Sequence, residues 1–160
     1  ARFAEFHRQF SRLDILVHNA GINSSAKAEV ATEQEWRRVL AVNLDGAFYW
    51  ARAAAPSMKK RGWGRIVNVS SLAAKGSELG SGAAYAASKG AIASLTFSLA
   101  RDLAASGVTV NAVSAGCVKT SGMEQMNERP SAGTATTADA VSPALAWMVV
   151  PSGNVMSWGI

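Results

Sequence analysis

The chain has 160 residues, of which 49% are hydrophobic and 17% charged, and its formal net charge is +5. This composition fits one folded domain with a substantial core, and it excludes a disordered or fibrous chain. The basic residues are scattered apart from Lys59-Lys60-Arg61, so we expect no nucleic-acid partner. We recognise no signal peptide and no apolar run of membrane-spanning length. The single cysteine, Cys117, fits a reducing compartment, and we expect a cytoplasmic protein.

The first part of the chain predicts a helix followed by a strand. Residues 1–13 carry apolar side chains at steps of three and four residues, which is typical of the end of an amphipathic helix. Residues 14–18 form a short apolar run that does not alternate, so we predict a strand buried on both faces. Asn19-Ala20-Gly21 closes that strand with turn residues. We interpret His18, at the strand end, as a structural residue.

A long helix is predicted next, from a capping box formed by Thr32 and Glu35 to an end near Gly62. Asn43 is a polar position inside this helix with apolar neighbours. Taken alone, it is interpreted as a side chain that faces solvent or binds a nearby backbone carbonyl.

Two more strands and one more helix complete the predicted fold. The strands cover residues 65–69 and 108–113, and the helix between them runs over residues 85–105 until Gly107 ends it. Strands that alternate with long helices predict a parallel sheet built from βαβ units. Ligands bind such sheets at the carboxyl ends of the strands, and residues 19–21, 70–71 and 114–116 all directly follow strands.

Three residue types near one strand end suit carbonyl and alcohol redox chemistry. Tyr85 and Lys89 are four residues apart, so on a helix they share a face. A cation held close to a phenol favours the ionised phenol, which suits a tyrosine for proton transfer near neutral pH. A serine hydroxyl at the end of the preceding strand would hold a substrate oxygen beside that phenol.

These motifs, in this order, resemble the short-chain dehydrogenase/reductase family. They are His18-Asn19-Ala20-Gly21, Asn43, Val69-Ser70-Ser71, Tyr85 through Lys89, and Val110 through Gly116. The resemblance implies an α/β fold with a three-layer, doubly wound Rossmann-type parallel sheet. It implies one partial dinucleotide-binding domain over residues 1–160, incomplete at its N-terminus. The implied activity is hydride transfer between NAD or NADP and a carbonyl or secondary alcohol.

The resemblance also implies roles for individual residues. Tyr85 would be the acid or base, Lys89 would assist it and bind the nicotinamide ribose, Ser71 would orient the substrate oxygen, and Asn43 would hold a relay water. Ser70 stays open as the alternative to Ser71, because the spacing to Tyr85 is one residue longer than is usual. The implied cofactor contacts are Asn19, Ala20, Gly21, Tyr85, Lys89, Ala115, Gly116, Val118 and Thr120. Ala115 stands where the family usually has proline, and we assign no metal site.

The resemblance carries implications for partners and for the sheet edge. In the family, the helices that match residues 32–62 and 85–105 pair with copies of themselves, which implies a dimer or tetramer acting on a small molecule, without a membrane partner. The glycine-rich loop and the ribose-reading residue of the family are missing from this sequence, so the choice between NAD and NADP is left open. We therefore expect the strand over residues 14–18 to present an unpaired apolar edge.

Two other functions stay open from the sequence. One is a truncated, non-catalytic relative that serves as an oligomerising scaffold or fragment. The other is a serine hydrolase that uses serine and lysine, although the sequence has no Gly-x-Ser-x-Gly elbow.

Overall fold

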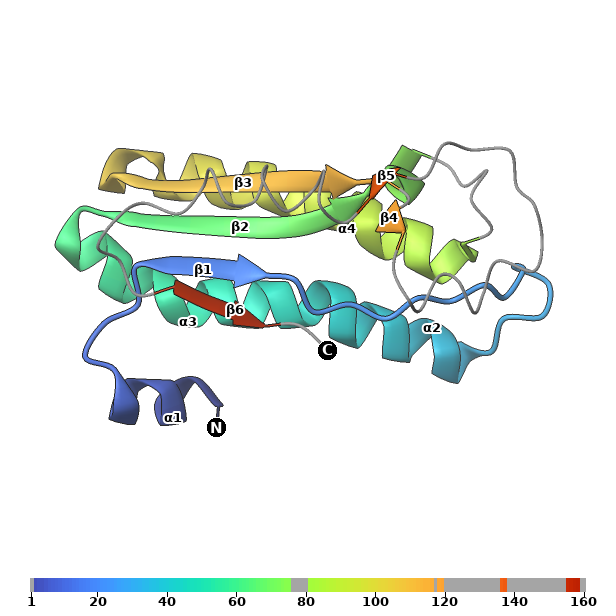
Figure 1. The fold of residues 1–160 in the computed structure, drawn as a ribbon, viewed down its shortest axis with the longest axis horizontal. Coiled ribbons are helices and arrows are strands. Elements are labelled where there is room, and N and C mark those ends of the chain that lie inside the picture. Colours follow the sequence, from blue (N-terminus) through green and yellow to red (C-terminus); the bar gives the residue numbers. More distant parts are fainter. Residues whose placement is uncertain (1, 76–80, 117, 120–135, 138–154, 159–160) are drawn as a thin grey trace.

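A parallel sheet with helices packed against it forms the centre of the protein. The computed structural model describes residues 2–75, 81–116, 118–119, 136–137 and 155–158 (Figure 1). The sheet has the strand order β3-β2-β1-β6, with all pairs parallel. Its strands are β1 (Ile15–His18), β2 (Gly64–Ser71), β3 (Val108–Ala115) and β6 (Val155–Trp158). A separate parallel pair joins β4 (Val118–Lys119) to β5 (Thr136–Thr137). The predicted α/β fold is confirmed.

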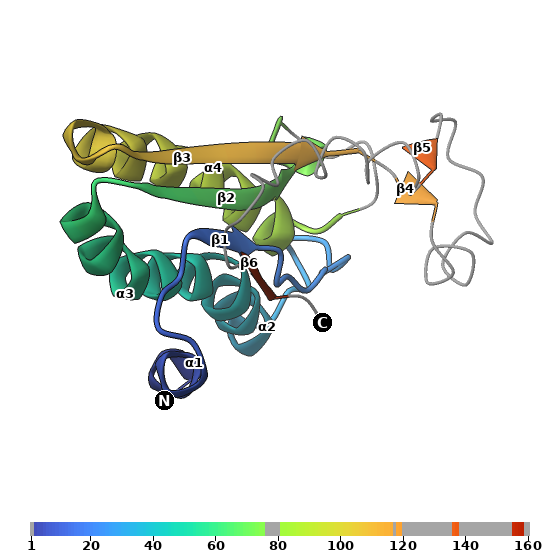
Figure 2. The same cartoon turned by 60° about the vertical axis from the view of Figure 1, so that its left-hand side comes forward.

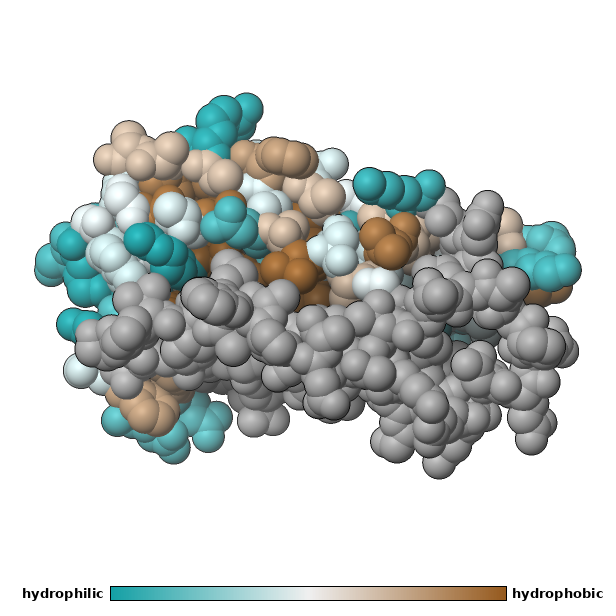
Figure 3. All heavy atoms as spheres, turned by 45° about the horizontal axis from the view of Figure 1, so that its top comes forward, coloured by the Kyte–Doolittle hydropathy of each residue, from teal (hydrophilic) through white to brown (hydrophobic). Residues whose placement is uncertain are grey.

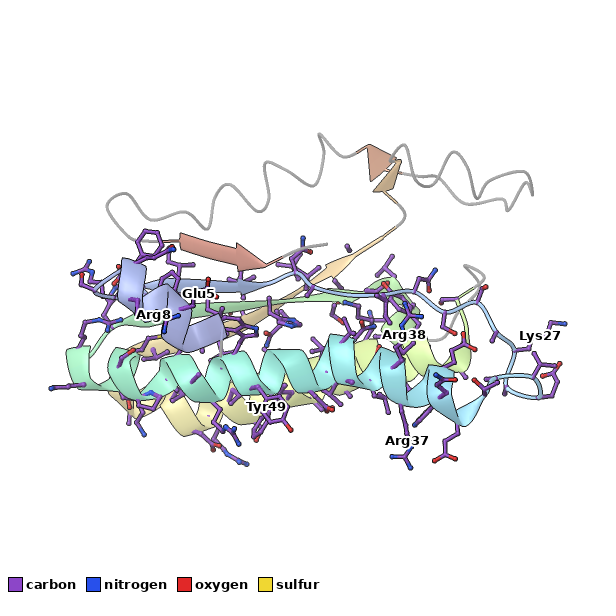
Figure 4. All side chains as sticks on the ribbon, turned by 90° about the horizontal axis from the view of Figure 1, so that it is seen from below. Glu5, Arg8, Lys27, Arg37, Arg38 and Tyr49 are labelled. Carbon is purple, nitrogen blue, oxygen red and sulfur yellow. The ribbon has the colours of Figure 1, made fainter. Side chains whose placement is uncertain are left out.

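The main helices lie together on one face of this sheet. The helices are α1 (Arg2–Gln9), α2 (Glu33–Leu40), α3 (Gly46–Arg61) and α4 (Ala83–Leu103). Figures 2 and 4 show α2, α3 and α4 as one layer against the sheet, while Figures 1 and 2 show α1 apart from this layer, past the β6 edge of the sheet. Short 3₁₀ turns follow β2 (η2, Leu72–Lys75) and α4 (η3, Ala104–Ser106). No described helix is both long and apolar enough to cross a membrane.

The core lies between the sheet and this helix layer. Leu16, Ile66 and Val110 are register partners on three neighbouring strands, and all three are buried. Ala54 and Met58 of α3 pack against them in the same cluster. This shared apolar row fixes the register, because a one-residue slip would turn a whole strand's core side chains to the other face. The carboxyl ends of β1, β2 and β3 are thereby held at one edge.

The prediction of an unpaired edge on the strand over residues 14–18 was wrong. In the structure β6 pairs with β1, so that Ile15 lies opposite Val155 and His18 opposite Trp158. The segment Val-Met-Ser-Trp has residues that favour strands, and it supplies backbone partners that this edge would otherwise lack. β1 is therefore paired on both sides.

The long helix predicted over residues 32–62 is not a continuous α-helix. A π-helical turn, η1 (Ala41–Asp45), separates α2 from α3, and the Gly46 N–H closes it by donating to Ala41 O. At the start, Thr32 Oγ1 accepts from the Glu35 N–H at 3.1 Å, as the predicted cap requires. The Glu35 carboxylate instead accepts from Ser24 Oγ at 2.7 Å, so it binds the preceding loop.

The predicted helix ends at Gly62 and Gly107 are confirmed. Both glycines have a φ of +69°, the left-handed region that favours glycine. At Gly62, the Trp63 N–H donates to Met58 O at 3.2 Å, as in a Schellman motif. A methyl group on Gly107 would collide with Gly62 O, so these two turns touch. This contact lies at the amino-terminal ends of β2 and β3.

The surface seen in Figure 3 mixes polar and apolar residues. Apolar residues (brown) lie between polar ones (teal) on the described part of this face. The core strand β3 contributes to the exposed surface, since Thr109 and Asn111 are exposed while Val108 and Val110 are buried. β3 thus shows the alternation of a strand with one buried face.

Candidate active site

A cleft opens where the carboxyl ends of the three core strands meet. Its volume is about 260 Å³. The lining comes from the loop after β1, the ends of β2 and β3, and the first turns of α4: Asn19, Gly21, Ile22, Asn23, Val69, Ser70, Ser71, Tyr85, Lys89, Ala115 and Gly116. The cleft therefore lies at the edge of the sheet where the sequence predicts ligand binding.

Tyr85 and Lys89 lie on the first turns of α4, facing the end of β2. Lys89 is only 5% exposed, and its Nζ donates to Val69 O at 2.8 Å. The same Nζ lies 5.7 Å from the centre of the Tyr85 ring. Burial lowers the pKa of the Lys89 ammonium. The structure thus brings a partly desolvated cation beside the phenol, as the four-residue spacing predicts.

The two serines at the end of β2 have different hydrogen bonds. Ser70 is buried, and its Oγ donates to Lys89 O at 2.8 Å. Ser71 is half-buried, and its Oγ accepts from the Ala73 N–H at 3.2 Å. Successive side chains of a strand point to opposite faces, which gives the two hydroxyls different surroundings. The Ser70 hydroxyl bonds α4 to β2. The Ser71 hydroxyl only accepts in its bond from Ala73, so its proton is available to donate to another group.

Asn43, in the π-helical turn, holds the loop after β1. Its side chain is fully buried. Asn43 Oδ1 accepts from the Ile22 N–H at 2.8 Å, and Nδ2 donates to Ile22 O at 3.1 Å and to Ser88 Oγ at 2.9 Å. The side-chain amide of Asn43 therefore makes hydrogen bonds to both the N–H and the carbonyl of Ile22. The interpretation as a bond to a nearby backbone carbonyl is confirmed, and the interpretation as a solvent-facing side chain was wrong.

Small residues leave room beside the Lys89 ammonium. A methyl group on Gly21 would lie 3.4 Å from Lys89 Nζ and 3.5 Å from Asn43 Oδ1. Ala115 and Gly116 line the cleft from the end of β3. A donor cation with glycine and alanine around it fits the ribose end of a nicotinamide dinucleotide, which needs hydroxyl partners and close approach to the backbone.

The other predicted cofactor contacts lie in different places. Asn19 is exposed in the cleft. Ala20 is buried at 5% exposure and is not among the residues that line the cleft. Val118 lies in the short strand β4. Thr120 lies outside the described residues.

The structure adds residues that sequence reasoning missed. Ile22 and Asn23 line the cleft, and their position directly after the Asn19–Gly21 turn was the available signal. Ser88 was also missed. It accepts from Asn43 and donates from its Oγ to Tyr85 O at 2.7 Å, so it joins the π-helical turn to α4. Only the three-dimensional meeting of two helices reveals that bond.

The start of α4 is packed directly on the loop after β1. The Gly82 N–H donates to Ser24 O, and a methyl group on Gly82 would collide with Ala26 O. Ser24 also bonds to Glu35, near the start of α2. The loop is thereby held from α4, from α2 and from Asn43, and this fixes the position of Tyr85 relative to the cleft.

His18 and Asn68 are two buried polar residues on the neighbouring strands β1 and β2. They are register partners on β1 and β2, and they are 3% and 0% exposed. Asn68 Nδ2 donates to Thr96 Oγ1 at 2.9 Å, whereas Asn68 Oδ1 has no partner among the described residues. Burial, and then the positive charge of Lys89, lower the pKa of His18 from 6.5 to about 4. His18 is therefore neutral at neutral pH, in line with its structural interpretation.

Comparisons with known proteins agree with this geometry. The profile of the family described as "short chain dehydrogenase" matches residues 1–131. The short-chain reductase protein NovJ of Streptomyces niveus is 43% identical over 121 residues, which cover 76% of this chain and 45% of that protein. The D-beta-hydroxybutyrate dehydrogenase of Rhizobium meliloti is 44% identical over 115 residues, covering 70% of this chain and 43% of that protein. This chain thus spans less than half the length of these two relatives.

A solved structure shows the same fold. The acetoin dehydrogenase YohF from Salmonella typhimurium superposes with a TM-score of 0.79 at 26% sequence identity. The superposition covers 99% of this chain and 68% of that one.

Proposed function

The chain belongs to the short chain dehydrogenase family, and we propose that it transfers a hydride between NAD(H) or NADP(H) and a carbonyl or secondary alcohol substrate. The observation that carries this proposal is the position of Lys89. Its buried ammonium lies 5.7 Å from the centre of the Tyr85 ring, inside the cleft at the strand ends. In the proposal this cation lies beside the tyrosine that transfers the proton.

In our proposal Tyr85 is the acid in reduction and the base in oxidation. During reduction, the carbonyl oxygen accepts the Tyr85 hydroxyl proton while the carbonyl carbon accepts the hydride that the nicotinamide supplies. The Ser71 hydroxyl donates a hydrogen bond to the same oxygen, keeps its own proton, and so orients the substrate. Ser71 is favoured over Ser70 because the Ser70 hydroxyl donates to Lys89 O.

Lys89 and the small residues around it would hold the cofactor. The Lys89 ammonium has donors beyond the one directed at Val69 O, and these suit ribose hydroxyls. Gly21, Ala115 and Gly116 allow close approach to the backbone, and Asn19 adds an exposed amide. Ala20, Val118 and Thr120 complete the proposed set of cofactor contacts, and the proposed cofactor is NAD or NADP.

Asn43 is proposed to connect Lys89 to solvent through a bound water. Both Asn43 Oδ1 and Lys89 Nζ lie close to the same side of Gly21. A water there would replace the proton that Tyr85 gives up, with Lys89 in between. The hydrogen bonds of Asn43 to Ile22 and Ser88 would keep this path fixed.

We also propose a homo-oligomer formed through the outer faces of α3 and α4. Large apolar side chains are exposed there: Phe48 at 40%, Tyr49 at 53% and Phe97 at 78%. Figure 4 shows Tyr49 on the side of α3 that faces away from the sheet. Exposed apolar patches of this kind mark interfaces. A cytoplasmic location stays a prediction from the single cysteine.

Dinucleotide binding tests the proposed function. NADH and NADPH are titrated separately into the chain, and quenching of its five tryptophans is followed. We expect saturable quenching by at least one of them, weakened about tenfold or more in Lys89→Met because a charged donor is lost. Lys75→Met, which removes an exposed lysine, is the matched control and should bind like the unmodified chain.

Turnover completes this test. The substrates are acetoin and 3-hydroxybutyrate, after the names of two similar proteins. Nicotinamide oxidation or reduction with either would support the proposal. Absence of saturable binding by both dinucleotides would contradict it and would support the scaffold alternative.

A further inference from the structure

The His18 imidazole lies close to Gly46, at the point where the π-helical turn closes. Its side chain is 3% exposed at the end of β1. A methyl group on Gly46 would lie 3.2 Å from His18 Nε2 and 3.8 Å from Ala41 O. The Gly46 N–H donates to that same Ala41 O, which is the bond that closes the turn. The tip of the imidazole therefore lies close to the residue that closes η1, and a methyl group on that residue would crowd the ring.

This turn places Asn43. A π-helical turn is less favourable than an α-helical one and persists in proteins as a single turn supported by its surroundings. Asn43 lies in the middle of η1 and reaches Ile22 in one direction and Ser88 in the other. A shift at Gly46 would move the Asn43 amide relative to both partners. The His18 imidazole beside Gly46 thus also helps to hold Asn43 in position.

The surroundings of His18 favour a neutral imidazole. Burial is the main cause of the lowered pKa of His18, and the positive charge of Lys89 on α4 acts in the same direction. On the neighbouring strand β2, the register partner of His18 is Asn68, whose side-chain amide is uncharged. Asp14, also in the first strand region, bonds to Arg12 at 2.9 Å, at the opposite end of β1. An uncharged ring can pack tightly beside Lys89, whereas a charged one would repel it.

We propose that His18 is a positioning residue: its imidazole braces Gly46, fixes the π-helical turn and thereby holds Asn43 beside Lys89. His18 acts through Asn43 and touches neither substrate nor cofactor. The catalytic consequence of this proposal rests on the proposed function, whereas its structural part does not.

A double-mutant cycle tests the catalytic consequence. His18→Asn removes the tip of the ring, and Gly46→Ala pushes a methyl group against it. We expect each single change to lower kcat about tenfold, with KM for the dinucleotide unchanged, because Asn43 loses its fixed position. The double variant should be no worse than either single one, since the smaller side chain makes room for the methyl group. His18→Gln, which keeps length and neutrality, should retain more activity than His18→Asn.

Gly90→Ala is the matched control. It also adds a methyl group to a helix, but at an ordinary 3.7 Å from Ala74 O, so it should leave kcat unchanged. Losses that multiply in the double variant, or a His18→Asn protein with unchanged kcat, would overturn the catalytic role.

Amide hydrogen exchange tests the structural part without any turnover. In His18→Asn we expect exchange at residues 44–46 to speed up about tenfold, while residues 92–96 in the middle of α4 keep their rates. Equal rates at residues 44–46 in both proteins would overturn the proposal. If the unmodified chain shows no turnover, the proposed function has failed, and hydrogen exchange alone decides whether His18 supports the turn.

Discussion

At the scale of single residues, the site depends on buried polar groups whose charge is controlled by their neighbours. His18 and Lys89 are both buried, and the pKa of each is lowered. A lowered pKa makes it easier for Lys89 to exchange a proton, and it keeps His18 neutral beside that cation. At neutral pH the imidazole is therefore uncharged beside the Lys89 ammonium.

His18 predicts a pH dependence of stability. Its pKa is about 4 in the folded chain, against an ordinary value of 6.5 when the chain is unfolded, so below pH 6.5 the unfolded chain binds a proton that the folded chain does not. The contribution of His18 to the free energy of unfolding is fully present above pH 6.5. It falls as the pH drops toward 4, by up to about 3 kcal/mol. Urea unfolding at pH 7 and pH 5 measures this loss, and His18→Gln should reduce it. An equal loss in that variant would assign it to other groups.

The two serines predict different effects on activity and stability. Ser71→Ala should lower kcat about a hundredfold, because a donor to the reacting oxygen is lost. Ser70→Ala should lower the free energy of unfolding by about 1 kcal/mol through the lost bond to Lys89 O, with a smaller loss of kcat. Steady-state kinetics and thermal unfolding of both variants give the comparison. A larger loss of kcat in Ser70→Ala would reverse the assignment.

At the scale of elements, local patterns predicted most of the fold. Strands followed from apolar runs and helix ends from Gly62 and Gly107, because these signals lie within a few residues of the feature they mark. The π-helical turn was missed, since one extra residue in a turn leaves the apolar pattern on either side intact. β6 was missed because its pairing with β1 joins segments far apart in the chain.

The candidate site was predicted to a similar extent. Tyr85, Lys89 and Ser71 meet in the cleft because the helix period and the strand ends place them there. Ser88, Asn23 and the support from His18 depend on contacts between α4, η1 and β1, which spacing within one element does not reveal. Family resemblance named the residues, and only the structure shows how each is held.

The junction of α4 with the loop after β1 predicts a sensitive glycine. Gly82→Ala would drive a methyl group into Ala26 O, and the shift needed to relieve this would move the first turn of α4. We expect a loss of about 1–3 kcal/mol of stability together with a fall in kcat. Thermal unfolding and kinetics are compared with Gly90→Ala, where the added methyl group has room. A Gly82→Ala protein as stable and active as that control would show that the junction is loose.

At the scale of the whole molecule, one sheet edge forms the cleft of the proposed reaction, and the outer faces of α3 and α4 form the proposed interface. Core packing between the sheet and α3 and α4 aligns the strand ends that form the cleft. The opposite sides of the same helices expose apolar side chains. One set of helices thereby supports both the site and the proposed interface.

The molar mass of the protein in solution tests the proposed interface. We expect light scattering on the eluting chain to give a dimer or tetramer, and Phe97→Glu to shift it toward monomer, because a charge would be buried at the interface. Val30→Glu is the control, since Val30 is 67% exposed in a loop away from these faces. A monomer for the unmodified chain, or equal sizes for Phe97→Glu and the unmodified chain, would contradict the proposed interface.

The most direct test of the central claim is turnover by Tyr85→Phe, measured together with its affinity for the dinucleotide. The account predicts that turnover falls about a thousandfold or more while binding stays within about twofold, because phenylalanine keeps the ring and loses only the proton that is transferred. Turnover by Tyr85→Phe at the rate of the unmodified chain would show that Tyr85 is not the acid or base.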